Sequence, residues 1–271
     1  MSAPARPRPP ACLALADGSI FYGMGFGATG QTVAELCFNT AMTGYQEILT
    51  DPSYAGQIIT FTFPHIGNVG TNDEDIENTK PVALGCILRQ DITEPSNYRA
   101  QKHFNDWLAE HGRIGIAGVD TRRLTKRIRT EGAPNGVICH SEDGSFDIEA
   151  LIAKANDWPG LEGMDLAKDN SCTTGYDWDE ALWTREGGYG KVGNAKHHVV
   201  AIDYGVKRNI LRNLASLDCK VSVVPATTSA DEILAMNPDG IFLSNGPGDP
   251  AATGEYAVPT IKTLIDSGKP V

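Results

Sequence analysis

Residues 240–250 hold the densest group of features that could do chemistry. An apolar run at 241–243 leads into a loop with two glycines and two prolines between Gly246 and Pro250. The run is too short for a helix and too apolar for an exposed strand, so it predicts a buried strand. Backbone N–H groups of such a loop can approach a substrate and stabilise a developing negative charge. The alternative is a tight strand-to-helix turn that binds nothing.

A second candidate turn lies at residues 51–54, which read DPSY. The pair Asp51-Pro52 predicts a turn, and the β-rich run 58–63 follows it. Ser53 is then placed to present polar groups at the edge of a domain. The alternative is that Ser53 only caps the turn through its hydroxyl.

The loop at Gly246 belongs to a segment in which strand and helix patterns alternate. This alternation predicts a parallel sheet with right-handed crossovers, in which ligands bind at the carboxyl ends of the strands. The expected strands are 199–202, 221–224 and 241–243, the expected helices are 210–217, 229–236 and 256–265, and a fourth strand is expected from Pro270. An independent domain of this kind usually needs more than about 100 residues, so we expect it to continue beyond Val271.

The first half of the chain is richer in strand patterns. Residues 11–22 predict a hairpin turning at Asp17-Gly18, and the signals that follow alternate between strands and helices. Residues 25–30, GFGATG, fit the spacing of a dinucleotide fingerprint. That fingerprint needs a strand before it and a helix after it. Here strand-forming residues follow, so we expect no nucleotide site. The remaining predictions are strands at 81–88, 114–119 and 137–139 and helices at 98–111, 120–131 and 148–155.

The predicted fold is therefore α/β, with four segments. A disordered leader, 1–10, precedes a β-rich mixed α/β domain at 11–140. A connection at 141–195 leads to a truncated doubly wound, flavodoxin-like parallel-sheet domain at 196–271.

Composition excludes several function classes. The net charge of −11 argues against nucleic acid and anionic membranes as partners. No run of about 20 apolar residues is present, which excludes a membrane-spanning helix. The six cysteines are scattered with no C-x-x-C pair, which favours reduced thiols in a cytoplasmic protein and no metal site.

The helix expected at 120–131 has one basic face. Its apolar face carries Leu124 and Ile128, and the other carries five lysines and arginines. On an acidic chain this face could dock an acidic partner. The alternative is a solvated helix surface.

Several long motifs, in order along the chain, carry a resemblance to a known family. From about residue 11 to Val271 the chain resembles the small subunit of glutamine-hydrolysing carbamoyl phosphate synthetase. Its second half also resembles class I glutamine amidotransferases. The motifs are TGYQEILTDPSY at 43–54, PHIGNVGTN at 64–72, DTRRLT at 120–125, DYGVKRNIL at 203–211 and LSNGPGDP at 243–250.

The resemblance implies a mechanism and a set of site residues. A cysteine attacks the amide carbon of L-glutamine, a histidine moves protons and an acid orients the histidine. Ammonia passes to the large subunit, which uses ATP and Mg²⁺ to make carbamoyl phosphate from bicarbonate, for arginine and pyrimidine biosynthesis. The small subunit itself needs no cofactor. By the resemblance, the backbone of Gly246 contributes to the oxyanion hole, and Gly248 and Ser53 line the glutamine site.

The chain departs from the family in one respect. The family's nucleophilic cysteine lies in a Gly-x-Cys-x-Gly elbow after the strand that starts at Pro270, so we expect it, the histidine and the glutamate beyond Val271. Cys219 is interpreted as structural, and residues 1–271 alone are expected to be inactive. The alternatives are a non-catalytic docking partner of the large subunit, and an amidase that acts on another substrate.

Overall fold

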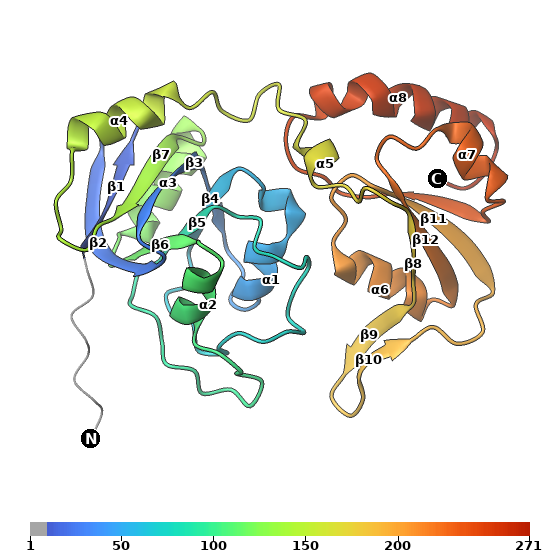
Figure 1. Cartoon of the computed structure of the whole chain (residues 1–271), viewed down its shortest axis with the longest axis horizontal. Helices are drawn as coiled ribbons and strands as arrows, with labels where there is room; N and C mark the ends of the chain where they lie inside the picture. Colours follow the sequence, from blue (N-terminus) through green and yellow to red (C-terminus); the bar gives the residue numbers. More distant parts are fainter. Residues whose placement is uncertain (1–9) are drawn as a thin grey trace. The chain divides into compact units, whose positions relative to one another are not determined.

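The computed structural model describes residues 10–271, which form two compact units that divide between Gly160 and Leu161 (Figure 1). Each unit has its own hydrophobic clusters. The expected leader, 1–10, lies outside the described residues except for Pro10, which begins the first strand.

The first unit is built on a closed barrel of seven strands. Three neighbouring pairs are parallel (β3–β4, β4–β5 and β5–β6), and the other four pairs are antiparallel. Around the barrel the strands are β1 (Pro10–Leu15), β2 (Ile20–Gly27), β6 (Ile114–Ala117), β5 (Gly85–Ile87), β4 (Gln57–Phe61), β3 (Gly30–Asn39) and β7 (Asn135–His140).

Alternation along the strands separates the barrel interior from its outer faces. In β1, Leu13 and Leu15 join a cluster to which β3, β4, β5, β6 and β7 also contribute, so this cluster fills the interior. Cys12 and Ala14 point the other way and pack against helix α4 (Ile148–Asp157). Successive side chains of β1 therefore face opposite layers while all of residues 11–15 are buried, as expected for a strand between two apolar layers.

The predicted hairpin at 11–22 is confirmed, because β1 and β2 pair antiparallel around Asp17 and Gly18. The G-x-G-x-x-G segment spans the end of β2 and the start of β3, so a strand follows it, as expected. At Gly25 a Cβ would lie 2.0 Å from the His140 ring, which explains the need for glycine there by packing.

Four helices and one 3-10 turn accompany the barrel. Helix α3 (Thr121–Glu131) confirms the helix expected at 120–131; the carboxylate of its N-cap, Asp120, accepts from the Arg123 N–H, and the helix ends before Gly132. Two expected elements are shorter than predicted, since the strand at 81–88 covers only β5 and the helix at 98–111 begins after His103. The elements are α1 (Tyr45–Thr50), η1 (Pro52–Tyr54), α2 (Phe104–Glu110), α3 (Thr121–Glu131) and α4.

The second unit is a four-stranded sheet with helices on both faces. Its order is β13-β11-β12-β8, with β11 parallel to both neighbours and β8 antiparallel at the edge. A two-stranded hairpin, β9 and β10, lies outside this sheet. The bounds are α5 (Leu166–Asp169), β8 (Tyr176–Trp178), β9 (Glu180–Thr184), β10 (Gly188–Lys191), β11 (His197–Asp203), α6 (Arg208–Ser216), β12 (Cys219–Pro225), α7 (Ala230–Ala235), β13 (Gly240–Leu243) and α8 (Pro250–Asp266).

Buried residues of β11 alternate between the two faces of this sheet. Val200 and Ile202 pack with α7 and α8, whereas Ala201 packs with α6. Figure 1 shows α7 and α8 on one face and α6 on the other. The predicted mixed α/β architecture, β-rich in the first half and doubly wound in the second, is confirmed.

Three predictions for this part of the chain need correction. The expected connection at 141–195 is instead divided between the units, because α4 packs on the barrel and β8 pairs with β12. The last helix begins at Pro250 and not near residue 256, so Pro259 lies inside it. Leu217, expected in the apolar stripe of α6, lies just past the helix end and is 71% exposed.

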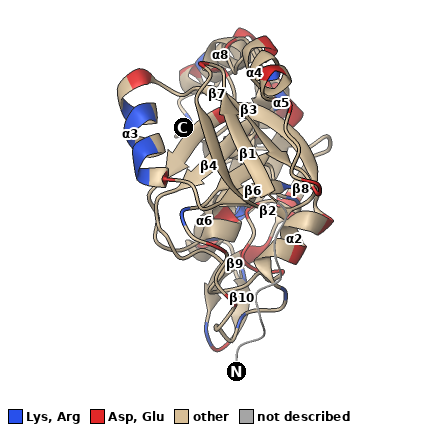
Figure 2. Ribbon diagram, turned by 90° about the vertical axis from the view of Figure 1, so that its left-hand side faces the viewer, with Lys and Arg blue, Asp and Glu red and all other residues tan. Residues whose placement is uncertain are grey.

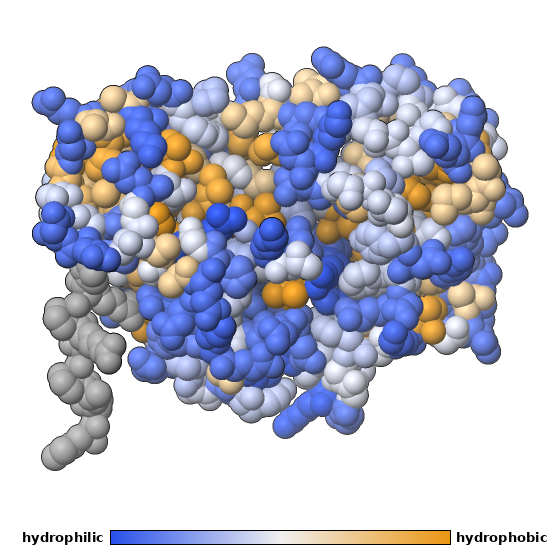
Figure 3. All heavy atoms as spheres, in the orientation of Figure 1, coloured by the Kyte–Doolittle hydropathy of each residue, from blue (hydrophilic) through white to orange (hydrophobic). Residues whose placement is uncertain are grey.

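No helix among residues 10–271 is long and apolar enough to cross a membrane. On the face drawn in Figure 3 hydrophilic residues dominate, and hydrophobic residues appear in separate patches.

Glu47, on α1, is a half-buried carboxyl near Asp75 and Glu77. Burial, followed by these two carboxylates, raises its pKa from 4.5 to about 7. A raised folded-state pKa means that this group's contribution to stability is present below about pH 4.5 and is lost as the pH rises through about 7. We expect Glu47→Gln to exceed the wild type in unfolding free energy by about 1–2 kcal/mol at pH 8 and by much less at pH 4. Urea unfolding at both pH values tests this, and an equal difference at the two would contradict it.

Candidate functional site

The loop between β13 and α8 contains the two glycines singled out from the sequence. Gly246 is exposed, Pro247 is buried, and Gly248 has a φ of +85°. Among the described residues, the N–H groups of Gly246 and Gly248 donate to no acceptor. Two backbone donors are therefore available at the carboxyl end of a parallel strand.

This loop is fixed to the turn that follows β11. The Ser244 hydroxyl accepts from the Tyr204 N–H at 2.9 Å, and the Asn245 amide donates to the Gly205 carbonyl at 2.9 Å. The neighbouring strands β11 and β13 run parallel, so their carboxyl ends bring the two turns together. At Gly246 a Cβ would lie 2.5 Å from the Tyr204 carbonyl oxygen, so only glycine permits this approach.

Asp203 organises the turn after β11. It is 5% exposed, and its Oδ1 accepts from the N–H groups of Gly205 and Val206 at 2.9 and 2.8 Å. Its Oδ2 accepts from the Cys172 N–H at 2.8 Å. A buried carboxylate with three N–H donors needs no cationic partner to compensate its desolvation.

On its far side the loop is held by Asp249 and the segment before α5. The Asp249 N–H donates to the Met164 carbonyl at 2.9 Å, and its carboxylate accepts from the N–H groups of Gly163 and Ala251. These two bonds lower the pKa of Asp249. Asp249 is also the N-cap of α8, with Pro250 in the first turn, an arrangement that suits a helix start.

A cavity of about 390 Å³ opens beside this loop. It is lined by Gly246, Gly248 and Tyr204, and by apolar residues of β13 and α8 such as Leu243 and Ala257. Tyr204 is 6% exposed, and its hydroxyl has no partner among the described residues. Burial raises the pKa of Tyr204, so its hydroxyl stays protonated at neutral pH and can donate.

Gly248 gives a direct test of how rigid this loop is. A Cβ there would lie 2.5 Å from the Met164 carbonyl oxygen, at a φ that disfavours side chains. We expect Gly248→Ala to lower the unfolding free energy of the second unit by at least about 2 kcal/mol. Gly254→Ala, inside α8 and in ordinary contact with Val258, is the control and should stabilise by about 0.5–1 kcal/mol. Urea unfolding measures both, and equal effects would count against a strained loop.

Comparisons with known proteins agree with this arrangement. Residues 13–138 match the family described as carbamoyl-phosphate synthase small chain, CPSase domain, and residues 200–271 match glutamine amidotransferase class-I. The carbamoyl phosphate synthase small chain of Ruegeria pomeroyi is 64% identical over 260 residues, which cover 96% of this chain and 67% of that one. The chain belongs to the carbamoyl phosphate synthase small chain family.

Further small chains show similar identity. Those of Bradyrhizobium diazoefficiens and Caulobacter vibrioides are 61% and 60% identical, and the matches cover 67% and 68% of their lengths. Among solved structures, an aminopeptidase from Aneurinibacillus sp. strain AM-1 aligns at 10% identity over 89% of this chain and 57% of that chain, with a TM-score of only 0.30. The resemblance drawn from the five motifs is thus confirmed.

None of the six cysteines of this small chain is prepared to act as a nucleophile. All are free, and burial raises the pKa of each thiol, to about 12 for Cys37 and Cys172. Cys172 is the one nearest to the loop turns, through its bond to Asp203, but the Asp203 carboxylate also disfavours a thiolate there. Cys219 begins β12, at the opposite end of the sheet from Gly246, as expected.

Ser53 lies in the first unit, in the 3-10 turn after α1. Asp51, not Ser53, caps this turn, since its carboxylate accepts from the Ser53 N–H at 2.9 Å. The neighbouring Tyr54 hydroxyl accepts from the Asn39 amide. The structure thus places Gly246 and Gly248 in one loop, and describes Ser53 separately, within the other unit.

Sequence reasoning did not identify Asp203, Tyr204 or Asn245 as parts of the site. The sequence pattern could have pointed to Asp203, because it is a carboxylate that directly follows the apolar run 199–202. Among the described residues no group of three or more His, Cys, Asp or Glu side chains is placed to hold a metal ion.

Proposed function

We propose that this protein is the glutamine-hydrolysing small chain of a cytoplasmic carbamoyl phosphate synthase. In this proposal it binds L-glutamine and releases ammonia to a large chain, which uses ATP and Mg²⁺ to form carbamoyl phosphate for arginine and pyrimidine synthesis. The observation that carries it is the loop of residues 244–250, whose two N–H donors at Gly246 and Gly248 lack acceptors among the described residues. Membership of the small chain family supports it.

The residues take separate roles in this proposal. The Gly246 N–H stabilises the oxyanion that forms when a thiolate adds to the glutamine amide. Gly248 and Ser53 bind the glutamine, and the Asp203 network holds the Gly246 loop in place. The nucleophile, the histidine and the glutamate come from outside these 271 residues, since four of the six thiols are buried, two are half-buried, and burial raises the pKa of each.

The experiment compares two forms of the small chain. Full-length protein with the large chain should convert glutamine to glutamate in step with carbamoyl phosphate formation. Residues 1–271 alone should release no ammonia from glutamine above a Gly246→Pro background. Full-length complex that makes carbamoyl phosphate from ammonia but not from glutamine would instead support a non-catalytic docking partner.

A further inference from the structure

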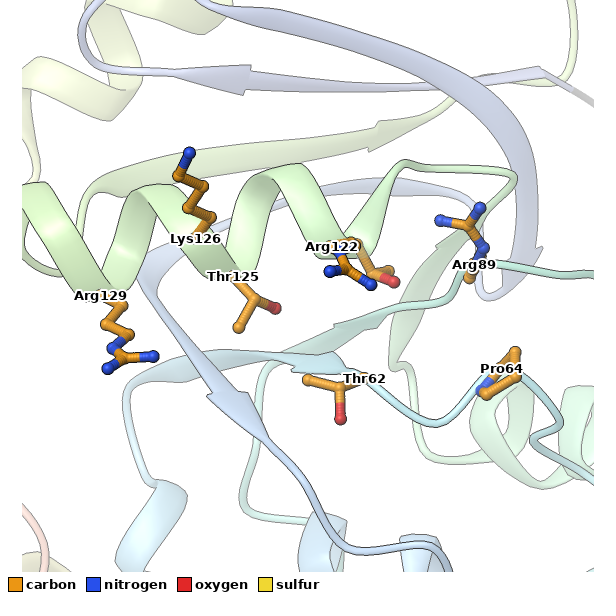
Figure 4. A pocket seen from close by; sticks show the side chains of 8 residues that line it. Thr62, Pro64, Arg89, Arg122, Thr125, Lys126 and Arg129 are labelled. Carbon is orange, nitrogen blue, oxygen red and sulfur yellow. The ribbon is translucent and has the colours of Figure 1, made fainter.

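The outer side of α3 borders a cavity of about 650 Å³. Four cationic side chains line it, from Arg89, Arg122, Lys126 and Arg129, together with the hydroxyl-bearing Thr62 and Thr125 (Figure 4). We call this cavity the α3 groove. Leu124 and Ile128, on the other side of the helix, are buried in the barrel cluster, which fixes the basic side outward.

Three of the four cations have no acidic partner within residues 10–271. Arg122, Lys126 and Arg129 are exposed and form no ion pair, whereas Arg89 pairs with Asp120 at 3.3 Å. Arg127, on the same helix, pairs with Asp17 and Glu131. In Figure 2 the outward side of α3 stands out as a continuous stretch of Lys and Arg. This concentration lies on a chain whose net charge is −11.

Helix stability does not explain Arg122 and Lys126, although it favours Arg129, which lies in the last turn of α3. Arg122 lies in the first turn of α3, where the helix dipole disfavours cations, and no acidic residue occupies that turn. Arg122 and Lys126 are four residues apart, a spacing at which like charges repel. Both effects destabilise the isolated helix, and an external anion would relieve them.

A hydroxyl on the same helix also lacks a partner. Thr125 Oγ1 is buried and makes no hydrogen bond within the described part of the chain. By contrast, the Thr130 hydroxyl donates to the Lys126 carbonyl at 3.0 Å, as threonines in helices commonly do. A buried hydroxyl without a partner therefore lies in the wall of the groove, beside its cations.

The arrangement of these side chains favours an extended ligand. In Figure 4, Arg122, Lys126 and Arg129 are spread along the helix and point in different directions, without a common centre. Residues 122 and 129 are about 10 Å apart along a helix axis. A single phosphate would need convergent donors, whereas carboxylates spaced along a peptide can meet separate cations.

We propose that the α3 groove binds an acidic segment of a partner protein. The partner to test is the large chain, so the choice of partner rests on the proposed function. Replacing arginines of such a surface by glutamates would place negative charges opposite an acidic partner, which weakens association and changes its salt dependence.

The experiment measures binding of full-length small chain to purified large chain by titration calorimetry at two salt concentrations. Arg122→Glu/Arg129→Glu is the groove variant. Lys80→Glu/Lys154→Glu is the control, because it makes the same change in charge at exposed sites of the same unit outside the groove. We expect the groove variant to bind at least 10-fold more weakly with a shallower salt dependence, and the control to change less than 2-fold.

Three results would overturn the proposal. The first is equal binding by the groove variant and the wild type. The second is equal weakening by the control. The third is tight binding of pyrophosphate that the groove variant abolishes while large-chain binding persists, which would mark a small-anion site. Either of the first two leaves the proposed function intact, whereas failure of the wild type to bind the large chain refutes the proposed partner itself.

Discussion

Replacing Gly246 by proline is expected to lower the glutamine-dependent rate of carbamoyl phosphate synthesis by about 100- to 1,000-fold, the usual cost of removing one oxyanion donor. The substitution deletes the backbone N–H that lacks an acceptor in the described structure. The measurement is glutamate release and carbamoyl phosphate formation by full-length small chain in complex with the large chain. Synthesis from ammonia should persist, because it bypasses the glutamine site.

The control for this variant is Gly246→Ala. Both substitutions place a Cβ about 2.5 Å from the Tyr204 carbonyl oxygen, so both introduce this clash. Only alanine keeps the N–H. If the two variants lose activity equally, crowding explains the loss and the donor role of Gly246 is wrong.

Asp203→Ala is expected to lower the unfolding free energy of the second unit by about 3–5 kcal/mol, because charge-assisted bonds to three N–H groups are lost and those donors are left buried. Since this turn also holds Ser244 and Asn245, glutamine-dependent activity should fall as well. Urea unfolding and amide exchange at Gly205 and Val206 measure the effect.

Asp239 provides the comparison for Asp203. Its carboxylate also accepts from a backbone N–H, that of His198 at 2.8 Å, but Asp239 is exposed. Water can replace that bond, so Asp239→Ala should cost less than about 1 kcal/mol. A cost for Asp203→Ala as small as this would show that the Asp203 network does not hold the turn.

The sequence was sufficient for elements whose signals are local. The helix expected at 229–236 is α7, which begins at a capping box of Ser229 and Glu232, and the helix expected at 120–131 is α3, which Asp120 caps. The pair Asp249-Pro250 is typical of a helix start, yet the helix was expected only at 256–265, with the loop of Gly246 and Gly248 continuing to that point. The expected start near residue 256 is wrong, since α8 begins at Pro250 and contains Pro259, while Ala257 and Leu264 of the same helix are buried against the sheet.

The sequence did not predict which strands pair when they lie far apart along the chain. Strand β8 is only three residues long, and it exists because Val221 and Val223 offer it an edge. Closure of the barrel depends on β7, which joins β1 and β3 although neither is near it in sequence. For the site, local composition located Gly246 and Gly248. The bonds to Tyr204 and Gly205 were missed because they join loops about 40 residues apart.

The pairing of β1 with β7 bears on the order of events during synthesis. Residues 11–15 find their second neighbour only in residues 136–140, so the barrel cannot close on the ribosome until nearly the whole first unit has emerged. Until then β1 has one free edge and the interior of the barrel is open to water. The second unit instead pairs β11 with β12 across a single helix, a connection of low contact order that forms quickly. The first strand made is thus expected to complete its pairing only after β7, the last strand of the barrel in sequence, has been made.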